Sequence, residues 1–84
     1  MEYIVTSKTP ILDLHGEIKD MVKVLVDQFI LDNLNQNNKV IRIVHGKSTN
    51  ILTEEVHWVL KHNDNVKEFH LNNWNLGETI VYLK

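Results

Sequence analysis

The sequence predicts a two-layer α/β (α+β) sandwich, in which two helices pack on a four-stranded mixed sheet in the order β-α-β-α-β-β. Two observations support this class. Two short runs of β-branched and apolar residues each end in His-Gly, at His15-Gly16 and His45-Gly46. Each run is followed by a segment whose apolar residues recur with helical spacing, which is the alternation typical of α/β folds.

The expected elements follow one another with short connections. They are a strand over Ile11–His15, a helix over Glu17–Asn35, a strand over Val40–His45, a helix over Ile51–His62 with Asn50 as its N-cap, a strand over Val66–Leu71, a loop over Asn72–Glu78, and an interior strand over Thr79–Leu83. In the first helix the apolar side chains fall on one arc at 100° per residue, while Val24 and Leu31 lie outside it. We expect the apolar N-terminal segment to cover these two residues; a partner surface is the alternative.

The length of 84 residues and the composition predict one small domain, with residues 1–10 as an N-terminal arm and residues 11–84 as the folded unit. The net charge of −2 argues mildly against non-specific binding of nucleic acid, which requires a basic surface. The chain has no Cys, so it has no disulfide and no thiolate metal site. Without a long apolar run or a signal-peptide pattern, we expect a cytoplasmic location and no membrane partner.

Two histidines are expected at one edge of the sheet. A strand, a helix and a strand in succession form a parallel βαβ unit, so His15 and His45 both lie at the carboxyl ends of parallel strands, where ligands bind in open α/β sheets. Asp13 and His15 share one face of an extended strand, about 7 Å apart. They are candidates for an acid/base pair; the alternative is a solvated strand end.

The loop from Gly46 to Asn50 is a candidate anion site, because a strand-to-helix junction directs backbone N–H groups and the positive end of a helix dipole to one spot. Lys47 lies in this loop. It is not a nucleotide P-loop, because position 41 is Ile where that signature requires Gly. A plain connection between strand and helix is the equally weighted alternative.

The remaining aromatic and histidine residues indicate packing more than chemistry. His57 and His62 lie about 140° apart on the second helix, so they do not form a metal-binding face. A Trp in a loop can stack on a nucleobase, but we expect Trp74 to seal the edge of the core instead. Trp58 is also expected to pack.

Leu12-Asp13-Leu14-His15-Gly16, followed by His45-Gly46-Lys47-x-Thr49, resembles the small MutS-related (Smr) domain. The closing Gly77-x-Thr79-x-Val81 pattern is also similar to that family. The resemblance implies a fold similar to the C-terminal domain of translation initiation factor three. It implies an endonuclease that nicks DNA or cuts RNA, with Asp13, His15 and His45 as catalytic residues and the loop residues Gly46, Lys47, Ser48, Thr49 and Asn50 at the phosphate. The chain departs from the family pattern, with Ser48, Asn50 and Asn75 where glycines are usual.

The expected function is therefore phosphodiester hydrolysis on DNA or RNA, with a divalent metal such as magnesium left open as cofactor. The alternative is a non-catalytic module that binds nucleic acid or a ribosome through the altered glycine loop. A larger repair or ribosome-associated assembly is a further possible partner.

Overall fold

The computed structural model describes residues 4–47 and 50–84. Along the chain the elements are β1 (Ile11–Asp13), α1 (Lys19–Asn35), β2 (Val40–Val44), α2 (Ile51–Lys61), β3 (Val66–Asn72) and β4 (Asn75–Leu83). The expected order β-α-β-α-β-β is confirmed. Within the described residues, no helix is long and apolar enough to cross a lipid bilayer.

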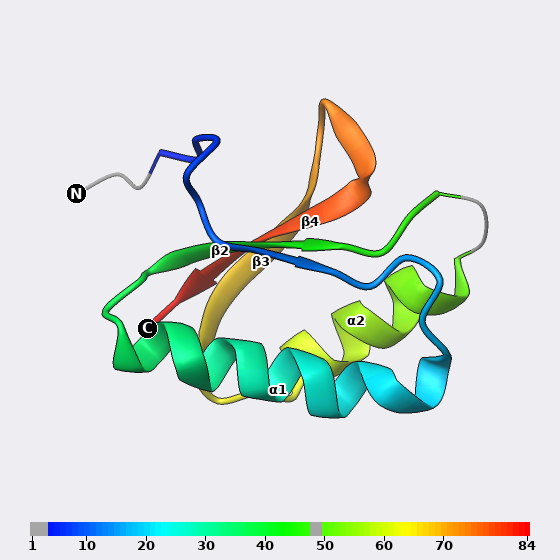
Figure 1. The fold of residues 1–84 in the computed structure, drawn as a ribbon, viewed down its shortest axis with the longest axis horizontal. Helices are drawn as coiled ribbons and strands as arrows, with labels where there is room; N and C mark the ends of the chain where they lie inside the picture. Colours follow the sequence, from blue (N-terminus) through cyan, green and yellow to red (C-terminus); the bar gives the residue numbers. More distant parts are fainter. Residues whose placement is uncertain (1–3, 48–49) are drawn as a thin grey trace.

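The four strands form one mixed sheet in the order β1-β2-β4-β3. β1 runs parallel to β2, and β4 is antiparallel to both of its neighbours, β2 and β3. The last strand therefore lies inside the sheet, as its apolar composition predicts. The parallel pair brings the carboxyl ends of β1 and β2 to the same edge, where both helices also begin (Figure 1).

Both helices cover one face of the sheet and enclose the core with it (Figure 1). α1 contributes Val22, Val26 and Ile30, which are spaced four residues apart and therefore fall on one side of the helix. The buried cluster consists of Leu14, Val22, Val26, Ile30, Ile41, Ile43, Val56, Val59, Leu60, Val81 and Leu83. This cluster holds the strands in register.

The N-terminal segment lies on the opposite face of the sheet from the helices (Figure 1). It is tied to β2 because the Arg42 guanidinium donates a hydrogen bond of 3.2 Å to the carbonyl of Thr9. The prediction that this segment covers Val24 and Leu31 is wrong, because those side chains lie on α1 and are 62% and 49% exposed. The arm packs over the open face of the sheet instead.

Two boundaries near the expected site differ from the prediction. β1 ends at Asp13, and α1 begins at Lys19. Between them the chain turns, with the N–H of Glu17 donating to the carbonyl of Leu14 at 2.9 Å. Gly16 has φ +85°, which only glycine adopts readily, and this ends the strand earlier than the apolar pattern indicates.

The expected loop over Asn72–Glu78 is a tight hairpin between β3 and β4. Trp74 lies at its turn and is 96% exposed, so the prediction that it seals the core is wrong. A two-residue turn leaves its side chains beyond the last paired residues, where no second layer covers them. Trp58 is 52% exposed and stacks on His62, so it packs only in part.

Candidate functional site

Asp13 and His15 are joined through the turn that follows β1. One carboxylate oxygen of Asp13 lies 2.6 Å from Nδ1 of the His15 ring, and the same oxygen accepts the backbone N–H of His15 at 3.0 Å. The prediction that both residues lie on one extended strand is wrong, because β1 ends at Asp13. The short polar side chain of Asp13 bonds to its own backbone two residues on, and that bond stabilises a turn in place of the strand.

This contact orients the imidazole. A carboxylate accepts hydrogen bonds, so Nδ1 of His15 carries the proton and Nε2 is directed away from Asp13. The His15 side-chain bond and then the backbone bond hold the pKa of Asp13 below its ordinary value of 3.8. Both side chains are exposed, so the pair can meet a macromolecular ligand at the surface.

The second motif lies beside this pair. A Cβ placed on Gly46 would be 3.7 Å from Cβ of His15. Gly46 has φ +86°, a backbone conformation that other residues rarely adopt. The tertiary structure thus brings the two His-Gly motifs together at one edge of the sheet, as the βαβ pattern predicts.

The loop at Gly46 is anchored by the start of β4. The backbone N–H groups of His45 and Gly46 both donate to the carbonyl of Gly77, at 2.9 and 3.0 Å. A Cβ on Gly77 would lie 3.1 Å from Cγ of Lys47, so glycine here lets the lysine stem pass close to β4. The next residue after Gly46 is Lys47, whose side chain is exposed. The backbone N–H of Gly46 is already bonded to the carbonyl of Gly77.

His45 lies inside the protein and is only 3% exposed. Its Nε2 is 2.8 Å from the hydroxyl of Thr79, and its Nδ1 is 2.8 Å from the hydroxyl of Thr53. The Nε2 of His57 is also 2.8 Å from the Thr79 hydroxyl. Sequence analysis missed this buried cluster, although the Gly77-x-Thr79 pattern places Thr79 in the same motif as Gly77.

The remaining loop positions are described in part. Ser48 and Thr49 lie outside the described residues. Asn50 precedes α2 as predicted, but its side chain makes no capping bond to the described part of the helix. Asn75, at another usual glycine position, accepts the N–H of Gly77 through its side-chain oxygen at 3.0 Å.

The residues at this edge do not form a protein-built metal centre. Across residues 4–47 and 50–84, no three or more His, Asp or Glu side chains are grouped to hold an ion. One oxygen of the Asp13 carboxylate already takes part in the two bonds to His15.

The fold and this edge define a small α+β domain in which an Asp-His turn and a His-Gly-Lys loop meet beside the starts of two helices. The model of the Smr domain family matches residues 12–84, and the chain belongs to that family. Its N-terminal residues precede the matched region.

Relatives of known name have the same domain within much longer chains. The chain is 38% identical over 76 residues to Endonuclease MutS2 of Geobacillus sp. (strain WCH70), covering 87% of this chain and 10% of the relative. It is 33% identical over 70 residues to Endonuclease MutS2 of Agathobacter rectalis, covering 83% of this chain and 9% of the relative. The chain therefore spans about a tenth of the length of these relatives.

Two solved structures share the fold. The Smr domain of Thermus thermophilus MutS2 superposes with a TM-score of 0.86 at 24% identity, covering 90% of this chain and 99% of that chain. YdaL, a stand-alone small MutS-related protein from Escherichia coli, superposes with a TM-score of 0.85 at 23% identity, covering 93% and 69%. The two-layer α+β architecture is thus that of Smr domains.

Proposed function

We propose that this chain is an endonuclease domain that hydrolyses phosphodiester bonds in DNA or RNA. The single observation that supports this most is the bond of 2.6 Å between Asp13 and His15, which directs Nε2 of an exposed imidazole toward solvent. The names of the MutS2 relatives support the same activity.

In the proposed reaction His15 acts as the general base. A water molecule attacks the phosphorus atom and transfers a proton to Nε2 of His15, while the bond from phosphorus to the leaving oxygen breaks and that oxygen takes a proton from solvent. Asp13 stabilises the imidazolium that forms and holds the ring in the required tautomer. Lys47 lies next to Gly46 and supplies positive charge to the phosphate oxygens as negative charge develops on them.

The geometry favours a positioning role for His45 over the catalytic role first expected. Both of its ring nitrogens lie within hydrogen-bond distance of threonine hydroxyls, and the side chain is almost fully buried. We infer that His45 holds the start of the Gly46–Lys47 loop against α2 and β4, while His15 contacts the substrate.

A non-catalytic module that binds nucleic acid is the second candidate. It is favoured by the altered glycine positions, where Ser48, Asn50 and Asn75 replace residues usual in the family. The N–H of Gly46 is bonded to Gly77 and is unavailable to a phosphate in either candidate. The net charge of −2 also suits selective binding at one patch better than general attraction to a polyanion.

Cleavage assays distinguish the two candidates. The purified chain is incubated with supercoiled plasmid and with structured RNA, in magnesium and in chelator, beside Asp13→Ala/His15→Ala and the control His62→Ala. His62 is an exposed histidine at the far end of α2. We expect cutting by the unchanged chain and by His62→Ala, and a loss of roughly a hundredfold or more in the double variant, because proton transfer contributes on that scale.

The other outcomes have distinct meanings. Equal cutting by the double variant contradicts the assignment of the site. A gel shift without cutting in either metal condition favours the binding module. Cutting that persists in chelator shows that the reaction needs no free divalent ion.

A further inference from the structure

Trp74 is presented at the site edge without any covering layer. Its indole is 96% exposed at the turn of the β3–β4 hairpin, the highest exposure among the large apolar side chains of the described residues. Single exposed apolar side chains are common on protein surfaces, so the exposure of Trp74 is informative only together with the groups that lie beside it.

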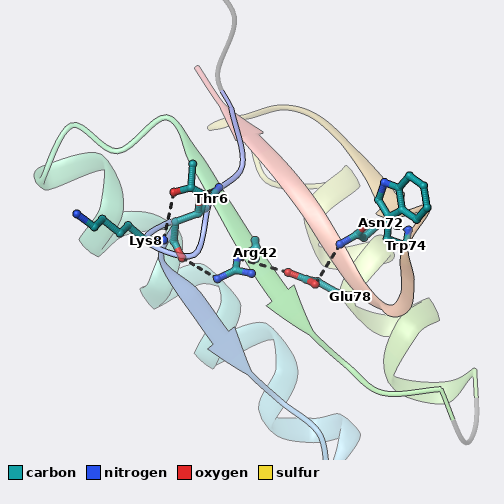
Figure 2. A network of polar contacts seen from close by, with 7 residues as sticks. Thr6, Lys8, Arg42, Asn72, Trp74 and Glu78 are labelled. Carbon is teal, nitrogen blue, oxygen red and sulfur yellow. Dashed lines mark hydrogen bonds and ion pairs between the residues drawn. The ribbon is translucent and has the colours of Figure 1, made fainter.

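The hairpin turn is held in place by a chain of polar contacts (Figure 2). The side chain of Asn72 accepts the backbone N–H of Trp74 at 3.0 Å and donates to Glu78 at 3.2 Å. Glu78 is buried and lies 3.5 Å from the guanidinium of Arg42, which in turn donates to Thr9. The turn that presents Trp74 is thus anchored on β4, β2 and the N-terminal segment.

A hollow of about 410 Å³ lies beside the indole, lined by aromatic rings, amides and the aliphatic side chains of Val5 and Ile80. The rings of His70 and Tyr82 lie in it with centroids 5.7 Å apart, and Asn73 adds an amide. Flat aromatic surfaces with neighbouring hydrogen-bonding groups suit an unpaired nucleobase, because every base has a π-face that stacks regardless of sequence.

The β3–β4 hairpin that carries Trp74 also contacts the loop proposed to hold the phosphate. Gly77 accepts the N–H groups of His45 and Gly46 and lies against Lys47. Trp74 is only three residues from Gly77, so their Cα atoms are at most about 11 Å apart. A strand whose phosphate lies at Lys47 therefore has a neighbouring nucleotide within reach of the indole.

We propose that Trp74 and the adjoining hollow bind an unpaired nucleobase of the substrate by stacking, so that the domain acts on single-stranded or unpaired segments. This inference rests on the proposed function for the phosphate at Lys47, but not on hydrolysis. A fully paired duplex keeps its bases stacked on one another, so it cannot occupy the hollow without losing a base pair.

Single-tryptophan variants test this directly, because the chain has two Trp residues. In Trp58→Phe the only indole is Trp74, and in Trp74→Phe it is Trp58. We expect an unstructured single strand to quench the fluorescence of Trp74 saturably, a matched duplex to quench it far less, and the fluorescence of Trp58 to stay unchanged.

Binding of a labelled single strand, followed by anisotropy, provides a second readout. We expect Trp74→Ala to weaken binding roughly tenfold, because one stacked base contributes on that scale, and Trp74→Phe to restore most of it. Trp58→Ala is the matched control and should bind like the unchanged chain. Circular dichroism verifies that each variant is folded.

Each contrary result has one meaning. If Trp74→Ala binds the single strand as tightly as the unchanged chain, or if a duplex quenches Trp74 equally, the stacking inference is wrong while the proposed cleavage can still stand. If the strand quenches Trp74 but is never cut, stacking stands and hydrolysis is wrong. If neither the single strand nor the duplex binds at low salt, the stacking inference and the proposed cleavage are both wrong.

Discussion

At the residue scale, the hydroxyl of Thr79 links two histidines that are far apart in the sequence. It lies 2.8 Å from Nε2 of both His45 and His57. One hydroxyl has a single proton, so it can donate to one ring nitrogen while it accepts from the other. The buried cluster therefore orders the protons on both rings and favours a structural role for His45.

The stability of the domain should depend on His57 near neutral pH. Burial of the His57 ring, which packs from α2 against Thr79 and Phe69, and then the neighbouring His45, lower the pKa of His57 below its ordinary value of 6.5. The unfolded chain then binds this proton more readily than the folded one. Stability is therefore highest above about pH 6.5 and decreases as the pH falls below that value.

Urea denaturation at several pH values measures this dependence. We expect His57→Gln to flatten the dependence between about pH 5 and pH 7, since the titrating group is gone. His62→Gln removes an exposed histidine instead and should leave the pH dependence unchanged. An unaltered slope in His57→Gln would show that another group causes the acid sensitivity.

At the scale of elements, the Gly46–Lys47 loop depends on β4 as much as on the strand and helix that it connects. The carbonyl of Gly77 accepts the N–H groups of His45 and Gly46, and β4 also supplies the Thr79 hydroxyl that lies against the His45 ring. Trp74 lies at the turn of the β3–β4 hairpin, three residues before Gly77. The start of the loop and the hairpin are therefore joined by hydrogen bonds at the edge of the sheet.

Gly46→Ala tests the backbone at the start of the loop. The added Cβ has room, because its nearest neighbour would be Cβ of His15 at 3.7 Å. The cost comes from φ +86°, and we expect the free energy of unfolding to drop by about 1–2 kcal/mol in chemical denaturation. Gly46→Asn should lose less, because Asn tolerates positive φ. Equal losses in both variants would indicate that space, and not backbone strain, is limiting.

At the scale of the whole molecule, helices cover one face of the sheet and the N-terminal segment lies on the other (Figure 1). Arg42 and Glu78 also lie on that second face, with side chains only 19% and 6% exposed. They connect the arm to the hairpin turn. The open face is thus organised by one partly buried ion pair.

Replacing one member of this ion pair should lower the free energy of unfolding more than replacing both members. Arg42→Met leaves the buried carboxylate of Glu78 uncompensated, and we expect a loss of roughly 3 kcal/mol in the free energy of unfolding. The double variant Arg42→Met/Glu78→Leu should recover much of that loss, because no buried charge remains. Additive losses in the double-mutant cycle would show that the two side chains do not interact.

The local periodicity of the chain predicted most of the architecture. Apolar residues on one side of each helix, and β-branched runs ending in His-Gly, were sufficient for the element order, the interior last strand and the meeting of His15 with Gly46. The turn after Asp13 was not predicted, because a side-chain bond to the backbone competed with the extended strand. The exposure of Trp74 was also missed, since hydrophobicity does not reveal whether a second layer covers a turn.

By itself, the sequence determined the layers, the family motifs and the residues that meet at one edge, because these depend on spacing along single elements and on the parallel crossover. Only the tertiary structure decided which residues are accessible. His45 is buried against Thr79, 34 positions away in the chain, while His15 is exposed beside Asp13. Such differences depend on how distant strands align in register, and no local pattern contains that information.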